Sequence, residues 1–215
     1  MKKLVPIILL LATLGLGCKY FSSMQGGGGP GGESGAGTGG KDPKTDIIAA
    51  SRKFIDLKFF SAKMDGMGQT EIKQQVDYVA PDRYHITYTA GTGAGMEIIM
   101  IGKDTYIKTG GKWNKSPGSN TPMPTLRDSF TENGLKALSD EKFEGSDTVD
   151  GKTELVYTYK NVTPTGNYPF SCKIWIGKDS GLPMKIVVDY TNGMLKQMTV
   201  NYDTETPVTI APPVS

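Results

Sequence analysis

The stretch IVVDYTNGMLKQMTVNY, residues 186–202, decides the fold class of this chain. Two runs rich in β-branched, aromatic and other apolar residues flank Asn192-Gly193. An Asn-Gly pair between two such runs is the strongest short-range signal for a β-hairpin. The stretch therefore predicts two antiparallel strands that follow each other directly along the chain.

Short apolar runs closed by turn residues recur on both sides of this hairpin. The earlier runs are EIKQQVDYVA (71–80), RYHITYTA (83–90), MEIIMIG (96–102), DTYIKT (104–109) and KWNK (112–115). The later runs are DTVDGKTELVYTYK (147–160), SCKIWIG (171–177), LPMKIVVDY (182–190) and a last expected strand, PVTIAP (207–212). Hairpin connections between runs of this length predict an antiparallel sheet of about ten or eleven strands.

Two segments have helical rather than alternating periodicity. In TDIIAASRKFIDLKFF (45–60) the apolar residues recur at helical spacing, with Thr45 or Asp46 available as the cap. LRDSFTENGLKALS (126–139) indicates a shorter, broken helix. The order helix, strands, helix, strands predicts an α+β fold in which helices pack on one face of the sheet.

The first 18 residues, MKKLVPIILLLATLGLGC, have the layout of a secretory signal. Two lysines precede an apolar run that is shorter than the roughly 20 residues needed to span a bilayer, and small residues then lead to Cys18. A cysteine at this place resembles the bacterial lipobox, in which the thiol receives acyl chains such as palmitate. We therefore expect a lipoprotein signal peptide at 1–17, lipidation of Cys18, a Gly-rich tether over 18–43 and one folded domain over 44–215.

The tether contains GAGTGGKD (35–42), one residue short of a phosphate-binding loop. Such a loop needs a hydroxyl where this chain has Asp42, and it follows a buried strand where this chain has more glycine. A flexible linker is the simpler interpretation.

Charge and composition argue against several functions. Without Lys2 and Lys3 of the signal, the 24 basic residues become 22, which equals the 22 acidic residues. A neutral chain has no electrostatic basis for binding nucleic acid. One histidine, His85, does not allow a multi-histidine metal site, and no cofactor is expected. Cys172 lies in an apolar run and is expected to be a buried free thiol.

A curved sheet with one apolar face must cover that face or hold a ligand on it. Flexible methionine side chains suit surfaces that adapt to varied apolar partners, and the chain has ten methionines. Strand alternation leads to eight expected cavity-lining residues: Phe54, Met96, Ile98, Met100, Trp113, Phe130, Trp175 and Met184. The alternative is that each is an ordinary core residue, and a register slip of one residue would reverse a whole strand.

The order of several segments resembles the lipoprotein-carrier (LolA-like) superfamily, which includes lipid-binding lipoproteins of the LppX/LprG kind. These segments are VDYVAPDRYHITYT (76–89), MIGKDTYIKTGGKWNKSP (100–117), GSDTVDGKTELVYTY (145–159), IWIGKDSGLPMKIVVDY (174–190) and VNYDTETPVTIAPP (200–213). The resemblance covers residues 44–213. It implies a half-open antiparallel β-barrel with helices in its concave face and an apolar space that holds acyl chains.

The sequence thus predicts an exported lipoprotein, not an enzyme, that binds lipid or the acyl chains of another lipoprotein as carrier or acceptor. The anchor on Cys18 holds it at a membrane of the cell envelope. Lys19 is not the aspartate that retains lipoproteins at the inner membrane, so the periplasmic face of the outer membrane is the expected site in a Gram-negative cell. Two alternatives stay open: an envelope-sensing or protein-interaction module with a filled cavity and no ligand, and a hydrolase that acts through His85.

Overall fold

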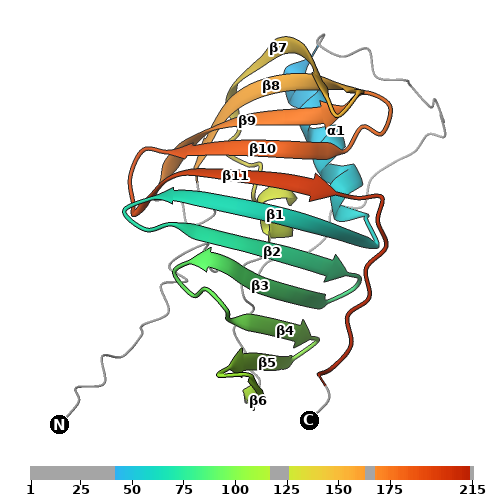
Figure 1. The fold of residues 1–215 in the computed structure, drawn as a ribbon. Helices are drawn as coiled ribbons and strands as arrows, with labels where there is room; N and C mark the ends of the chain where they lie inside the picture. Colours follow the sequence, from blue (N-terminus) through green and yellow to red (C-terminus); the bar gives the residue numbers. More distant parts are fainter. Residues whose placement is uncertain (1–41, 117–125, 163–167, 214–215) are drawn as a thin grey trace, which may run out of the picture.

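The structure is a computed structural model that describes residues 42–116, 126–162 and 168–213. These residues form one α-helix, one short 3-10 helix and eleven strands (Figure 1). The helices are α1 (Pro43–Ile55) and η1 (Leu126–Phe130). The strands are β1 (Phe59–Gly68), β2 (Ile72–Val79), β3 (Arg83–Gly91), β4 (Glu97–Ile101), β5 (Asp104–Thr109), β6 (Lys112–Ser116), β7 (Ser139–Val149), β8 (Lys152–Val162), β9 (Pro169–Gly177), β10 (Pro183–Tyr190) and β11 (Leu195–Asp203).

All eleven strands belong to a single antiparallel sheet with the order β6-β5-β4-β3-β2-β1-β11-β10-β9-β8-β7. Two meanders, β1 to β6 and β7 to β11, meet where β1 pairs with β11. The strands β6 and β7 are the two edges of the sheet, so the sheet is not closed. The architecture fits a half-open β-barrel, and the expected α+β class and strand number are confirmed.

Asp42 sets the start of α1. Its side chain accepts hydrogen bonds from the backbone nitrogen of Thr45 at 3.2 Å and from the Thr45 hydroxyl at 2.6 Å. Pro43 follows at the first helical position, where a missing N–H has no cost. The N-cap is therefore Asp42 and not Thr45 or Asp46. Asp42, which stands where a phosphate-binding loop has a hydroxyl residue, thus has a structural role.

Three element predictions are wrong in detail. The helix ends at Ile55, and residues 59 and 60 begin strand β1, which the alternation did not reveal. The second helical region is reduced to η1 followed by turns, so α1 is the only α-helix in the part of the chain described. Residues 207–212 form no strand, because prolines at both ends remove backbone donors.

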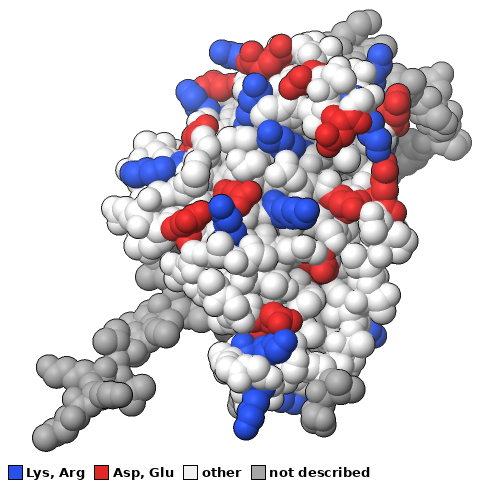
Figure 2. All heavy atoms as spheres, in the orientation of Figure 1, with Lys and Arg blue, Asp and Glu red and all other residues white. Residues whose placement is uncertain are grey.

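The sheet has an inner face, which contacts α1, and an outer face on its other side. Along β2, β3 and β4, the directly opposed residues Tyr78, Tyr84 and Met100 belong to the inner face. The neighbouring positions Asp77, His85 and Ile99 belong to the outer face. Figure 2 views the outer face, where basic and acidic side chains are interspersed.

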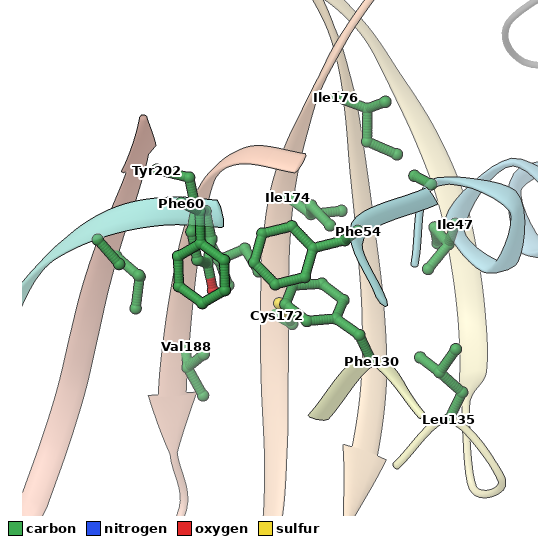
Figure 3. Close-up of a cluster of buried hydrophobic side chains, with 14 of the residues drawn as sticks. Ile47, Phe54, Phe60, Phe130, Leu135, Cys172, Ile174, Ile176, Val188 and Tyr202 are labelled. Atoms are coloured by element: carbon green, nitrogen blue, oxygen red, sulfur yellow. The ribbon is translucent and has the colours of Figure 1, made fainter. Parts of the chain in front are cut away.

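The core lies between α1, η1 and the inner face (Figure 3). The ring of Phe54 on α1 lies 4.8 Å from that of Phe60, 4.5 Å from that of Phe130 and 4.9 Å from that of Tyr202, measured between centroids. All four residues are buried. This aromatic cluster fixes the single helix against the middle of the sheet.

Candidate functional site

A band of half-buried apolar side chains continues the inner face beyond this core. We call it the inner-face band, and its members are Met64, Ile86, Met100, Phe170, Tyr190 and Met198. Each packs against the buried core while part of its surface stays exposed. The helix α1 contacts β7, β10 and η1, and Figure 1 shows it behind the strands at the β7 end of the sheet. The band therefore extends along strands that α1 does not cover fully.

Ionisable groups in the band and in the core beside it lie in a poorly hydrated environment. Burial raises the pKa of the Cys172 thiol to about 12 and the pKa of the Tyr190 hydroxyl to about 12. Burial also raises the pKa of Tyr159 and that of Tyr202 well above the ordinary tyrosine value. All four groups are neutral at physiological pH, so this side of the sheet carries no charge from them.

Few polar groups interrupt the band. Gln74 lies on the inner face beside Met64, and its side-chain amide is 3.1 Å from the Met64 sulfur. Asn161 is buried and donates to the backbone oxygen of Gly134 at 2.7 Å. The side-chain nitrogens of both amides thus have partners within the protein, and the surface around them is suited to apolar contact.

The eight predicted lining residues fall into three groups. Phe54, Phe130 and Ile98 are buried, and the first two belong to the aromatic core. Met100 belongs to the inner-face band. Met96 and Met184 are half-buried, at the turn before β4 and at a bulge in β10 respectively.

The two tryptophans lie on the outer face. Trp175 opposes Lys185 and Val156, while its neighbour Ile174 points into the core. Its ring has Lys173 Nζ at 4.9 Å and Lys185 Nζ at 4.8 Å, and its Nε1 donates to Asp147 at 3.2 Å. Trp113 opposes Lys108, whose Nζ is 5.6 Å from the ring centre. The structure does not bring these two residues to the inner-face band.

Alternation could not assign Trp175 to a face, because Ile174, Trp175 and Ile176 are all buried and the apolar run has no gap. Met64 and Met198 were missed for another reason. Met64 lies in the strand that the sequence does not reveal, and nothing in the sequence distinguishes Met198 from the many other apolar strand positions. The directly opposed pairs Met64–Val200 and Met198–Val188 identify their face only once the register is known.

A shallow hollow of about 240 Å³ lies over β1, β2 and β3. Its lining includes Lys63, Asp65, Lys73 and Thr89, all exposed. Lys73 pairs with Glu71 at 3.1 Å, which partly neutralises the basic side chains at this place. Met64 of the inner-face band and Gln74 also line this open hollow, so it adjoins the band at β1 and β2.

His85 lies on the outer face, as the alternation predicted. Its Nε2 is 3.3 Å from a carboxylate oxygen of Glu97, whose other oxygen accepts from Lys108 Nζ at 2.7 Å. The pKa of Glu97 is lowered, chiefly by the hydrogen bond from Lys108. This cluster supplies a histidine and a carboxylate but has no serine among the hydrogen-bond partners described for His85.

Other features concern metals and the membrane. Within residues 42–116, 126–162 and 168–213, no three His, Cys, Asp or Glu side chains are placed to hold a metal ion. In the same ranges no helix combines the length and apolarity needed to cross a membrane. The predicted lipidation site Cys18 and the tether lie outside the described residues.

Comparisons with known proteins agree with this geometry at the level of the fold. No protein-family model and no curated protein sequence matches the chain. The crystal structure of lipoprotein LppX from Mycobacterium tuberculosis superposes with a TM-score of 0.58 at 14% identity, covering 79% of this chain and 98% of LppX. LprF from Mycobacterium bovis gives a TM-score of 0.60 at 13% identity, covering 80% of this chain and 97% of LprF.

This protein therefore has the fold of LppX and LprF. The LppX/LprG-like fold that the sequence resemblance implies is thereby confirmed.

Proposed function

We propose that this protein is an exported lipoprotein that binds a hydrophobic ligand, lipid or the acyl chains of another lipoprotein, along the inner-face band. The observation that carries the proposal is the band itself. Its six apolar side chains stay partly exposed on the face that also holds the core. The fold shared with LppX, a lipoprotein, supports the same conclusion.

Affinity on such a surface comes from removing acyl chain from water. Burial contributes about 0.8 kcal/mol for each methylene group. Three of the six band residues are methionines, whose flexible side chains adapt to chains of different length and branching. The band therefore favours a class of apolar molecules over one particular shape.

The anchor belongs to the same proposal. Acyl chains on Cys18 would hold the protein at the membrane, and the Gly-rich residues up to 41 would let the domain turn relative to the bilayer. The functional role is carrier or acceptor, without catalysis. In a Gram-negative cell the location is the periplasmic face of the outer membrane.

A direct test is native mass spectrometry of the full-length chain carrying Cys18→Ser, which has no thiol for acylation at that position. The protein is mixed with phospholipids and acylated peptides, freed of excess ligand, and then extracted with solvent. We expect added mass that disappears on denaturation and is recovered as lipid. An unchanged mass with every ligand would reject the proposal.

One observation favours a second candidate, a protein-interaction module with a filled cavity. Phe54, Phe60, Phe130 and Tyr202 already occupy the inner face beneath α1 with the protein's own side chains. A chain that stays free of lipid in the same experiment would support this candidate.

A further inference from the structure

We propose that Arg127 binds the anionic head of the hydrophobic ligand, so that the ligand is an amphiphile with a carboxylate or phosphate group. This inference rests on the proposed function, because it concerns the polar end of the molecule that the inner-face band holds. It assigns to the site a specificity that the apolar side chains do not provide.

Arg127 is a cation placed against the inner face. It lies in η1 three residues before Phe130, and residues three apart in a 3-10 helix project from the same side. Phe130 enters the aromatic core, while the Arg127 guanidinium carbon lies 4.6 Å from the centre of the buried Tyr78 ring. Sequence and geometry thus direct both side chains toward the sheet.

Only some of the N–H donors of the Arg127 guanidinium have hydrogen-bond acceptors within the described residues. Nη1 donates to the Tyr78 hydroxyl and Nη2 donates to the backbone oxygen of Ile55 at the end of α1. Nε is buried and has no hydrogen-bond partner. A guanidinium has five N–H donors, and a buried donor without an acceptor is costly. The unpaired Nε marks a position where an acceptor is missing.

The charge of Arg127 is also uncompensated. Its hydrogen-bond acceptors are a hydroxyl and a carbonyl, and among the described residues no carboxylate forms an ion pair with it. Guanidinium groups bind carboxylate and phosphate oxygens with particularly strong, directional hydrogen bonds. An anionic ligand head would supply both the missing acceptor and the missing negative charge.

Beyond this point the inner face continues through the buried Tyr78 and Tyr84 to Met100 and Ile86, which are partly exposed members of the inner-face band. Tyr78 opposes Tyr84 on β3, and Tyr84 opposes Met100 on β4. Ile86, two residues along β3, lies on the same face. Neighbouring strands are about 4.8 Å apart, so Met100 lies about 10 Å from Tyr78 across the sheet, a distance well within the reach of an acyl chain. The head at Arg127 and the chain over Met100 and Ile86 together use one side of the inner-face band.

The test compares two ligands with the same acyl chain, one with an anionic head and one with a neutral head, on the full-length chain carrying Cys18→Ser. Dodecanoate and its methyl ester compete with a neutral fluorescent dye such as Nile red. We expect dodecanoate to bind at least about tenfold more tightly, because a hydrogen bond to a charged group contributes more than one to a neutral group. Acetate and inorganic phosphate are included as head groups without a chain, and we expect no displacement by either.

A variant links the preference to Arg127. In Arg127→Gln, which keeps a planar polar side chain without charge, we expect the ratio between dodecanoate and its ester to fall to about one. Arg52→Gln is the matched control, because Arg52 is exposed on α1, and it should keep the full ratio. If Arg127→Gln does not fold, as judged by circular dichroism, the comparison of the two ligands on the unaltered site decides alone.

The possible outcomes distinguish the role of Arg127 from the binding of a hydrophobic ligand in general. Equal affinity for acid and ester overturns the role of Arg127 and leaves hydrophobic binding intact. Displacement by acetate or phosphate at similar concentrations would show a site for free anions and also overturns it. Failure of both dodecyl ligands to bind rejects the proposed function itself.

Discussion

The rings of Phe54 and Phe130 lie 4.5 Å apart, although 75 residues separate them in the sequence. Phe54 lies at the end of α1 and Phe130 at the end of η1. Their contact therefore holds the two helical elements directly against each other. Tyr202 of β11 packs edge-on against both rings. Three distant parts of the chain therefore contribute one aromatic unit to the buried core on the inner face.

This unit predicts the stability of the fold. Phe54→Ala removes a fully buried ring, and we expect the free energy of unfolding to fall by about 3–5 kcal/mol. Met67→Ala is the control, because Met67 is 57% exposed, and its effect should stay within about 0.5 kcal/mol. Urea titration followed by circular dichroism measures both. Equal effects of the two substitutions would contradict the placement of Phe54 in the core.

The C-terminal segment should also contribute to stability. Ile210 is buried, and its backbone oxygen accepts from Arg83 Nη1 at 2.8 Å. Ile210→Ala should lower the free energy of unfolding by about 2–4 kcal/mol, because it leaves a cavity beside an ordered tail. The neighbouring exposed Thr209 gives the control, Thr209→Ala. Thermal unfolding measures both variants. If the segment around Ile210 does not pack against the domain, neither substitution will change the unfolding temperature.

Cys172 gives a prediction about chemical reactivity. Burial raises the pKa of its thiol to about 12, so at about pH 8 roughly one molecule in ten thousand carries the reactive thiolate. We expect iodoacetamide to leave Cys172 unmodified in the folded Cys18→Ser chain and to modify it fully in guanidinium chloride. Mass spectrometry measures the modification. Rapid labelling of the folded chain would show that this part of the inner face is open to water.

Glu154 predicts how stability depends on pH. It is buried on the outer-face side of β8, one of its carboxylate oxygens has no hydrogen-bond partner, and burial followed by the nearby Asp147 raises its pKa. The folded state thus favours the protonated form. Its favourable contribution is fully present below the unfolded pKa near 4.5 and is lost as pH rises through the higher folded value.

Glu154→Gln should therefore stabilise the protein at pH 7, by about 1 kcal/mol, and the gain should shrink below about pH 4.5. Thermal unfolding across this pH range measures the difference. The exposed Glu132 provides the control, Glu132→Gln, for which we expect no such pH dependence. A destabilising effect of Glu154→Gln at pH 7 would mean that the carboxylate has a favourable partner.

Much of the fold follows from local patterns in the sequence. Asn192-Gly193 and the other short turns specify hairpins, and hairpin-linked strands such as β1 to β6 and β7 to β11 have few arrangements other than a meander. The strand β1 was not recognised, because its stretch from Ser61 to Gly68 mixes small, charged and apolar residues. Its pairing with β11 is a long-range contact that no local pattern encodes.

The candidate site was harder to predict than the fold. Faces can be assigned from alternation only where apolar and polar residues alternate, as in β3 around Tyr84 and His85. In β9 the apolar run is continuous, and in β6 one tryptophan stands among polar residues, so the faces of Trp175 and Trp113 depend on register. Arg127 gave no sequence signal, because its role depends on a contact with Tyr78 across 49 residues.

The central claim is that the inner face binds an apolar ligand, and two adjacent residues of β11 test it most directly. Met198 belongs to the inner-face band, while Thr199 beside it points to the outer face, and both are half-buried. The measurement is the amount of lipid retained by Met198→Lys and by Thr199→Lys in native mass spectrometry, each in the full-length Cys18→Ser chain. We expect Met198→Lys to lose at least about 90% of the bound lipid, because a charge in the band must be desolvated, and Thr199→Lys to retain it. Equal retention by the two variants, or loss only with Thr199→Lys, would contradict ligand binding on the inner face.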